Sequence, residues 1–151
     1  MAEVRRVLGS SLHYDERYGL YTLDGEPFTG VSYSVWPNGR LDSESELRDG
    51  LNWGVSRSWY STGQPLGEAT MRAGVLHGRS REWHTNGQFA EDGEYEYGIA
   101  LWERKWDEAG ALVEEYTLTE ADRNFELLRS FRRTYGGSQD AEPGAAADGG
   151  A

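Results

Sequence analysis

Residues 59–98 read WYSTGQPLGEATMRAGVLHGRSREWHTNGQFAEDGEYEYG, and this stretch contains one unit twice. The segment WYSTGQ at 59–64 returns as WHTNGQ at 83–88, which gives a period of 24 residues. A related copy with Gly39 in its turn precedes the pair, and a shorter copy with Gly110 follows it. Repeats of this length stack on their neighbours, so the sequence predicts a quasi-one-dimensional array.

Each unit has the pattern of a β-hairpin. Before one turn, Val55, Arg57 and Trp59 alternate with serines, which is the period of a strand. An alternating strand also follows each turn. The turns themselves all contain glycine, and they lie at residues 37–39, 61–63, 85–87 and 108–110. Asn-Gly supplies the positive-φ residues that tight hairpin turns need. We therefore predict an all-β fold, a single-layer array of stacked antiparallel β-hairpins with a period of about 24 and a C-terminal capping helix.

The repeat resembles the MORN-repeat-variant family. Residues 19–30, GLYTLDGEPFTG, are similar to the opening phrase of that family. The Trp-Tyr-x-x-Gly-Gln motif at 59–64 and Leu-His-Gly at 76–78 are similar to its repeat core. The resemblance covers about residues 18–118 and implies a bacterial protein made of stacked hairpins. It also implies an antitoxin or immunity role, because many similar bacterial chains carry that label.

The sequence divides into four predicted segments. Residues 1–17 form an N-terminal extension with a short extended piece, and residues 18–118 form the repeat domain. Residues 119–135 have apolar side chains at helical spacing. We predict that they form a helix with Thr119 as its N-cap, and that this helix caps the last hairpin. Residues 136–151 consist mostly of Gly, Ala, Asp and Glu, so we predict a disordered tail.

The chain is acidic. Its 151 residues include 15 Lys and Arg and 26 Asp and Glu, for a net charge of −11. Residues 18–118 hold 8 basic and 17 acidic side chains, a net charge of −9. This balance argues against nucleic acid and against an anionic membrane surface as partners, because both are bound through Lys and Arg.

Several classes of site and location are disfavoured by what the sequence lacks. The chain has no cysteine, no spacing typical of metal ligands and no Gly-rich phosphate loop, so we predict neither a metal nor a cofactor. It begins without an apolar leader, and no apolar run approaches the roughly 18 residues of a spanning helix. We therefore expect a cytoplasmic protein.

Apolar residues recur on both sides of each turn. The two columns are Val35, Trp59, Trp83 and Trp106 before the turns, and Leu41, Pro65, Phe89 and Leu112 two residues after each turn glycine. If the columns meet across each hairpin, they form a stripe along one face of the sheet. We predict that this stripe is structural core; a platform on which a ligand stacks is the alternative.

An acid stands five residues after each turn glycine. These acids are Glu44, Glu68, Asp92 and Glu115, and we predict that they form a column on the face opposite the tryptophans. Neighbouring strands lie about 4.8 Å apart, so like charges in such a column repel one another and need counter-charges. Arg40, Arg48 and Arg72 are candidates for that role. The acids either keep a thin sheet soluble or bind a basic protein partner.

The histidines are the candidates for acid–base chemistry. His13 lies close to Asp15 and Glu16, which brings an acid and a base together in a short segment. His84 occupies the repeat position of Tyr60, so it has a structural explanation as well. No partner motif accompanies either histidine, and we predict no catalytic site.

Three functional hypotheses follow from these patterns. We favour non-enzymatic protein binding of the antitoxin or immunity kind, in which Glu44, Glu68, Asp92 and Glu115 contact a basic toxin or effector. The second hypothesis is a scaffold that holds two proteins of one pathway along the array. The third is an enzyme that acts on a peptide or a small substrate through His13 and nearby acids.

Overall fold

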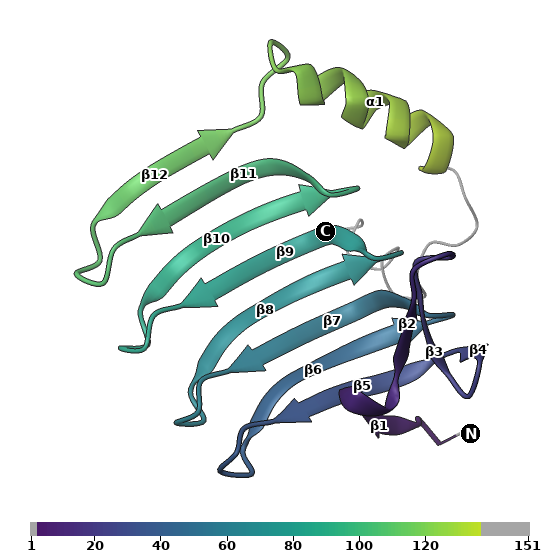
Figure 1. Cartoon of the computed structure of the whole chain (residues 1–151). Helices are drawn as coiled ribbons and strands as arrows, with labels where there is room; N and C mark the ends of the chain where they lie inside the picture. Colours follow the sequence, from purple (N-terminus) through teal and green to yellow (C-terminus); the bar gives the residue numbers. More distant parts are fainter. Residues whose placement is uncertain (1–2, 137–151) are drawn as a thin grey trace. The chain divides into compact units, whose positions relative to one another are not determined.

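The computed structural model describes residues 3–136 and shows a long sheet of antiparallel hairpins, followed by one helix (Figure 1). This confirms the predicted all-β array of stacked hairpins. The chain divides after Leu118 into two compact units. The predicted disordered tail, 136–151, lies outside the described residues except for Gly136.

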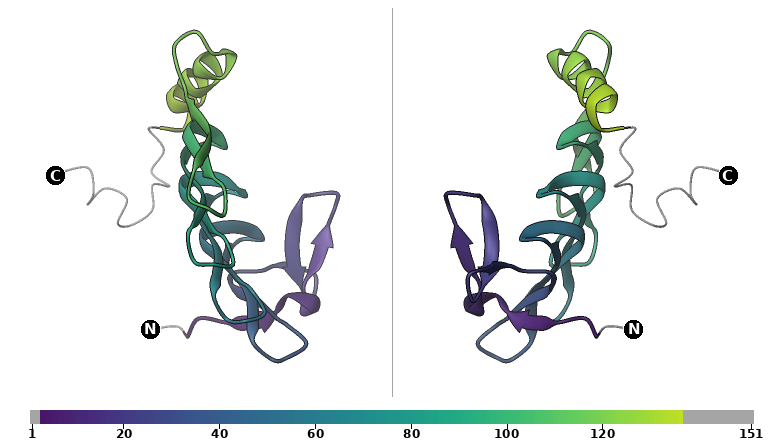
Figure 2. Two further views of the ribbon diagram at one scale, coloured as in Figure 1. Left: turned by 90° about the vertical axis from the view of Figure 1, so that its left-hand side faces the viewer. Right: turned by 90° about the vertical axis from the view of Figure 1, so that its right-hand side faces the viewer.

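The main sheet has nine strands in the order β1-β5-β6-β7-β8-β9-β10-β11-β12. All its neighbouring strands are antiparallel except the pair of β1 with β5, which is parallel. Figure 2 shows β5 to β12 as a single layer. The strands are β1 Arg6–Leu8, β5 Gly30–Val35, β6 Leu41–Arg48, β7 Leu51–Trp59, β8 Pro65–Arg72, β9 Val75–Trp83, β10 Phe89–Glu96, β11 Ile99–Trp106 and β12 Leu112–Thr117.

A second, three-stranded sheet contains residues that the sequence places in the extension and in the first repeat. It consists of β2 (His13–Asp15), β3 (Leu20–Leu23) and β4 (Glu26–Pro27), and a short 3-10 helix (Gly9–Ser11) precedes it. The first atypical repeat therefore leaves the main sheet. That the N-terminal extension ends at residue 17 stays a prediction.

Backbone hydrogen bonds join the small sheet to the first tight turn of the main sheet. The Tyr21 N–H donates to the Gly50 carbonyl at 2.9 Å, and the Gly50 N–H donates to the Phe28 carbonyl at 2.8 Å. Phe28 and Leu47 are buried at this junction, and Ile99 is buried further along the main sheet. The apolar core of this unit is therefore small and local.

Two kinds of turn alternate along the array. Two-residue loops join the strands at one end of the hairpins, at residues 49–50, 73–74 and 97–98, and both residues of each loop have positive φ. This is the type I′ geometry that suits the twist of paired strands. Positive φ is uncommon for residues other than glycine, so Ala73 and Tyr97 occupy strained positions.

The longer loops at the other end of the hairpins differ from the prediction that both residues of Asn-Gly have positive φ. In the loop that contains Asn38 and Gly39, only Gly39 has positive φ. The Asn38 side chain accepts from the Arg40 N–H at 3.0 Å and donates to the Ser61 carbonyl of the next loop at 2.8 Å. Asn38 therefore holds the loop and connects two repeats, rather than supplying a left-handed backbone.

A column of side chains connects each hairpin to the next. Trp36 Nε1, the Tyr60 hydroxyl and His84 Nε2 occupy the same repeat position. They donate to the carbonyls of Trp59, Trp83 and Trp106 at 3.0, 2.7 and 2.8 Å. Three different side chains thus form the same hydrogen bond, and the stacking of repeats does not depend on a buried second layer.

The C-terminal unit contains the predicted helix, α1 (Arg123–Tyr135). Its N-cap is Asp122, so the prediction of Thr119 was wrong. The Asp122 carboxylate instead accepts from the Thr119 N–H at 2.7 Å and from the Thr119 hydroxyl at 3.1 Å, which forms a turn before the helix. That α1 caps the last hairpin stays a prediction.

The turn glycines generate a stability prediction. Gly87 has φ of 84°, and an added Cβ would meet no atom within 4 Å, so only backbone strain opposes a side chain there. We expect Gly87→Val to lower the free energy of unfolding by about 1–3 kcal/mol. Thr85→Val, at an exposed position of ordinary φ in the same loop, is the control. Equal midpoints for the two variants in urea unfolding would contradict the turn assignment.

Candidate functional site

The predicted acidic column is a row of alternating charges. Strand pairing places Arg57 between Glu44 and Glu68. The same alternation continues across the next strands, so the row reads Glu44, Arg57, Glu68, Arg81, Asp92, Arg104 and Glu115. We call this row the charge ladder, and the face that carries it the ladder face. The four acids do line up, but an arginine stands between each neighbouring pair.

Each acid of the ladder has an ion-pair partner, and the predicted partners were wrong. Arg6 contacts Glu44 at 2.9 Å, Arg57 contacts Glu68 at 3.0 Å, and Arg104 contacts Glu115 at 3.2 Å. Of the predicted counter-charges, Arg48 and Arg72 instead lie over the Trp53 ring, and Arg40 donates to the Thr62 carbonyl. Arg57, Arg79 and Arg104 come from the strand across the long loop from their acids, and Arg6 comes from β1, so strand pairing is needed to identify these partners.

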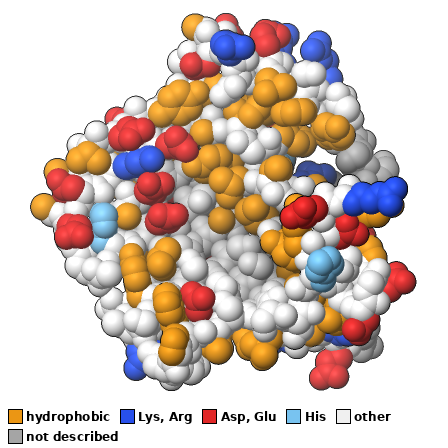
Figure 3. Space-filling view, viewed as in Figure 1, with side chains coloured by type: hydrophobic (Ala, Val, Ile, Leu, Met, Phe, Trp, Pro, Cys, Tyr) orange, Lys and Arg blue, Asp and Glu red, His pale blue; other side chains and the backbone are white. Residues whose placement is uncertain are grey.

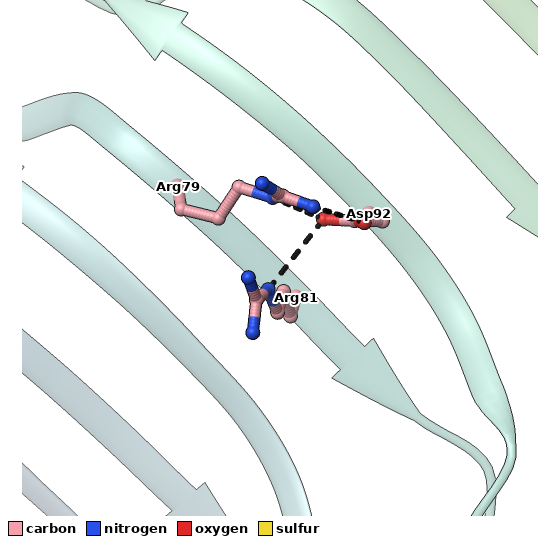
Figure 4. A network of polar contacts seen from close by, with 3 residues as sticks. All are labelled: Arg79, Arg81 and Asp92. Carbon is pink, nitrogen blue, oxygen red and sulfur yellow. Dashed lines mark hydrogen bonds and ion pairs between the residues drawn. The ribbon is translucent and has the colours of Figure 1, made fainter. Parts of the chain in front are cut away.

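Asp92 makes the tightest of these contacts (Figure 4). Arg79 Nε and a second guanidinium nitrogen each donate to one Asp92 oxygen at 2.6 Å, and Arg81 Nε lies 3.8 Å away. The Asp92 side chain is only 12% exposed. The hydrogen bond with Asp92 raises the pKa of Arg79. A two-bond arginine–carboxylate contact with little exposure is stronger than a solvated surface pair.

The ladder and the apolar stripe share one face, which corrects the prediction of opposite faces. Trp59 pairs with Pro65, whereas Ser58 pairs with Gly67, so β8 contains one extra residue at this point. Such a bulge shifts the alternation of side chains by one. Equivalent irregularities occur in the other hairpins, so every acid moves to the face of the tryptophans.

The apolar columns meet as predicted, but they do not form a buried core. Trp59 pairs with Pro65, Trp83 with Phe89, and Trp106 with Leu112. The Phe89 ring lies 5.7 Å from the Trp83 ring and 6.1 Å from the Trp106 ring, and Phe89 is 42% exposed. The stripe stays accessible because the main sheet is a single layer. It therefore offers an apolar surface beside the charge ladder.

A shallow depression on the ladder face combines both features. It has a volume of about 420 Å³, and its lining includes Trp59, Pro65 and Trp83 from the stripe and Arg57 and Glu68 from the ladder. Aromatic side chains and arginine are the residue types that contribute most to binding at protein interfaces. This part of the sheet can therefore bind another protein through apolar contact and through exchange of exposed ion pairs.

The opposite face is lined by small side chains. Strand pairing aligns Ser32, Ser45, Ser56, Ala69, Ser80 and Gly93 in one row across the sheet. We call this face the serine face. A hollow of about 260 Å³ on this face is lined by Leu12, by Tyr21 of the small sheet and by Ser45 of the main sheet. The small sheet therefore stands on the serine face. Figure 2 shows β2 and β3 projecting from the same side of the main sheet.

An acidic cluster on the serine face was missed as a separate feature. Glu82 lies directly opposite Glu91, and Lys105 follows in the same row with Glu114 beyond it. Lys105 Nζ lies 3.4 Å from Glu91, whose charge raises the pKa of Lys105. Figure 3 views this face, where acidic side chains gather over β9 to β12. The cluster was overlooked because Glu82 lies on β9 before a long loop and Glu91 on β10 after it, and only the strand pairing shows that they face each other.

Two further groups in this region, Glu82 and Tyr95, have a raised pKa. Burial raises the pKa of Glu82, and the facing Glu91 raises it further. Burial also raises the pKa of Tyr95, whose hydroxyl donates to Glu103 at 2.5 Å. Glu82 and Glu91 are therefore a like-charge pair that Lys105 offsets only in part, in contrast to the matched pairs of the ladder face.

The catalytic candidates occupy separate structural positions. His13 is exposed on β2 of the small sheet, and the Asp15 carboxylate accepts from the N–H groups of Arg17 and Tyr18 in the turn after β2. His84 lies in a loop of the main sheet and bonds to the Trp106 carbonyl. The structure therefore assigns Asp15 and His84 to turn and repeat contacts.

Within residues 3–136, no group of three or more His, Cys, Asp or Glu side chains could hold a metal ion. The helix found among these residues is too short and too polar to cross a bilayer.

Comparison with known proteins places the chain in a family. The immunity protein YwqK of Bacillus subtilis (strain 168) is 54% identical to it over 112 residues, which is 74% of this chain and 73% of the relative. The chain belongs to the family of this immunity protein. No family model matches the sequence, so the resemblance to MORN repeats stays a prediction. No solved structure matches it either.

Because the relative is named as an immunity protein, the exposed surfaces of the repeat unit are the candidates for a functional site. The ladder face presents an accessible aromatic stripe beside matched charges, and the serine face presents unmatched acids. Only the first of these coincides with the residues Glu44, Glu68, Asp92 and Glu115 selected from the sequence.

The repulsion between Glu82 and Glu91 predicts how the stability of the protein depends on pH. The pKa of Glu82 is raised in the folded protein, so ionisation of this group disfavours folding. Stability is lost as pH rises from about 4, where an unfolded glutamate ionises, through the raised pKa. We expect Glu82→Gln to unfold like the parent at pH 3 and to be more stable by about 0.2–1 kcal/mol at pH 7.

The exposed Glu16→Gln is the matched control for this measurement by thermal melting. It should leave the stability unchanged at both pH values. A Glu82→Gln variant that is less stable than the parent at pH 7 would show that the carboxylate is stabilising, which contradicts the repulsion between Glu82 and Glu91.

Proposed function

We propose that this chain is an immunity protein that neutralises a protein toxin by binding it on the ladder face, without catalysis. The observation that carries the proposal is the 54% identity over 74% of the chain to a protein named as an immunity protein. The stripe of exposed Phe89 and the half-buried Trp83 and Trp106 supports a protein partner, because accessible aromatic side chains are typical of binding hot spots.

We further propose that the toxin surface is basic. The net charge of the chain is −11, which favours association with a cationic protein through long-range attraction. On the ladder face, the pairs Arg57–Glu68 and Arg104–Glu115 are about half exposed, so their carboxylates remain open to a cation of the partner. The pairs also keep the free protein from accumulating like charges on that face.

Absence of catalysis is supported by the roles of two of the three candidate residues. His84 is used in the column of bonds that joins repeats, and Asp15 is used in a turn. Both side chains therefore have structural partners of their own. Occlusion of the toxin by a rigid sheet requires no chemical step.

The test of function uses the genes that neighbour this one in its own genome. Each neighbouring reading frame is expressed in a heterologous bacterium, with and without this chain, and growth is followed. We expect one product to arrest growth alone and to be harmless when this chain is present, and the two proteins to elute together from a size-exclusion column. If a toxic product arrests growth equally in both cases, or no product is toxic, the immunity role is contradicted.

The binding surface is tested with matched aromatic variants. Phe89 lies in the exposed stripe, and Tyr14 is an exposed aromatic residue of the small sheet with one ring neighbour of its own. We expect Phe89→Ala to weaken binding of the toxin by about tenfold or more, as truncation of a hot-spot residue does. Tyr14→Ala should leave the affinity unchanged. The reverse order of effects in isothermal titration would move the binding surface off the ladder face.

A further inference from the structure

The main sheet ends at an open edge, strand β12. Its neighbour among the described strands is β11, and its side chains from Leu112 to Glu115 are all exposed. Leu112 is 48% exposed and Val113 is 63% exposed. An edge strand offers a row of backbone N–H and C=O groups with which another strand can pair.

The charge ladder stops at this edge on an acid. Glu68 lies between Arg57 and Arg81, and Asp92 lies between Arg81 and Arg104. Glu115 has Arg104 on one side, at 3.2 Å, and the open edge on the other. Glu68 and Asp92 each stand between two arginines, and Glu44 stands between Tyr33 and Arg57. Glu115 differs from all three because its position beyond β12 is not filled by a described strand.

On the serine face, the neighbouring residue Glu114 likewise has a cation on one side only. Glu114 pairs with Lys105 of β11, and within residues 3–136 no strand follows β12 in the order of the main sheet. Successive residues of a strand point to opposite faces, so Glu114 and Glu115 present one carboxylate on each face of the edge. β11 shows what complements them: Arg104 and Lys105 are successive residues, and Trp106 follows opposite Leu112.

We propose that β12, rather than being capped by α1, binds a basic β-strand of the toxin by strand addition, with cations at two successive positions opposite Glu115 and Glu114. The partner strand continues the sheet through backbone hydrogen bonds and continues the ladder through its side chains. A large apolar residue after the two cations contacts Leu112. This inference deepens the proposed function, on which it rests for the identity of the partner as a protein toxin.

Charge also excludes a second copy of this chain as the occupant of the edge. Two β12 strands in antiparallel pairing bring the carboxylates Glu114 and Glu115 of both copies together, which like-charge repulsion opposes. The other edge strand, β1, has only three residues, Arg6–Leu8, and pairs in parallel with its neighbour. It is too short to cover the six residues of β12.

The probe for the experiment is a synthetic peptide with the sequence of β11, IALWERKW (residues 99–106), labelled at its N-terminus. This strand is the known complement of β12. Fluorescence anisotropy measures its binding to the full chain. We expect saturable binding that weakens as salt is added, because part of the attraction is between exposed charges. A peptide with Glu in place of the Arg and Lys should not bind.

Variants of the full chain locate the site. Glu114→Lys combined with Glu115→Lys should weaken binding of the β11 peptide by about tenfold or more and should bind the acidic peptide instead. The control is Glu16→Lys combined with Glu26→Lys, two exposed acids of the small sheet that give the same change of net charge. It should bind the β11 peptide nearly as well as the parent. If the double lysine variant does not fold, the paired Gln variants give a smaller loss of binding.

The backbone contribution is tested with two further peptides, each N-methylated at alternate residues. Strand pairing predicts that one pattern abolishes binding and the other does not, because the N–H groups of a strand point alternately toward and away from its neighbour. Equal binding of both methylated peptides means charge attraction without strand addition and overturns the proposal.

Three other results also overturn it: no binding of the β11 peptide, equal loss in the control variant, or dimers of the free chain that the double lysine variant abolishes. The last result assigns the edge to a second copy. Each of these outcomes leaves the growth assay with the neighbouring genes unaffected. Failure of the edge proposal is therefore distinguishable from failure of the immunity role.

Discussion

The main sheet is one layer thick, so most of its side chains must find their partners within the sheet itself. Burial stabilises only a few positions, such as Phe28, Leu47 and Ile99 in the repeat unit. The remaining order comes from contacts that recur once per hairpin: tight turns at positive φ, side chains that bond to the carbonyls of the next repeat, and matched charges. All three depend on the register of strand pairing, because a slip of one residue sends every side chain to the other face.

The charge ladder follows from that constraint and gives the surface its character. The ladder acids stand on β6, β8, β10 and β12, and Arg57, Arg81 and Arg104 stand on β7, β9 and β11 between them. The ladder face therefore has closely matched charges although the chain carries −11 overall. Matched pairs oppose wrong registers, since a slip replaces attraction by mismatch. The same arrangement leaves an aromatic stripe accessible and ends at β12 in two acids, Glu114 and Glu115, each with a cation of β11 on one side. Stability and recognition therefore rest on the same row of residues.

Much of the fold was predictable because the repeat is a local signal. The period of 24, the hairpins, the pairing of Trp83 with Phe89, and the C-terminal helix all follow from spacing in the sequence. The predictions that failed are those that depend on the register of strand pairing. The bulge beside Pro65 moves Glu68 to the tryptophan face, and only the pairing of β7 with β8 reveals Arg57 as its partner. The separate small sheet was missed because residues 18–30 resemble a repeat while their hydrogen bonds lead elsewhere.

The central claim is that the acids of the ladder face are held by arginines rather than repelled by one another. A double-mutant cycle on Arg79 and Asp92, with Arg79→Met and Asp92→Asn singly and together, measures this coupling from urea unfolding. We expect a coupling of about 1 kcal/mol or more for this little-exposed pair, and about 0.2–1 kcal/mol for the exposed pair Arg104–Glu115. A coupling near zero at Arg79–Asp92, with Asp92→Asn alone stabilising the protein, would contradict the claim.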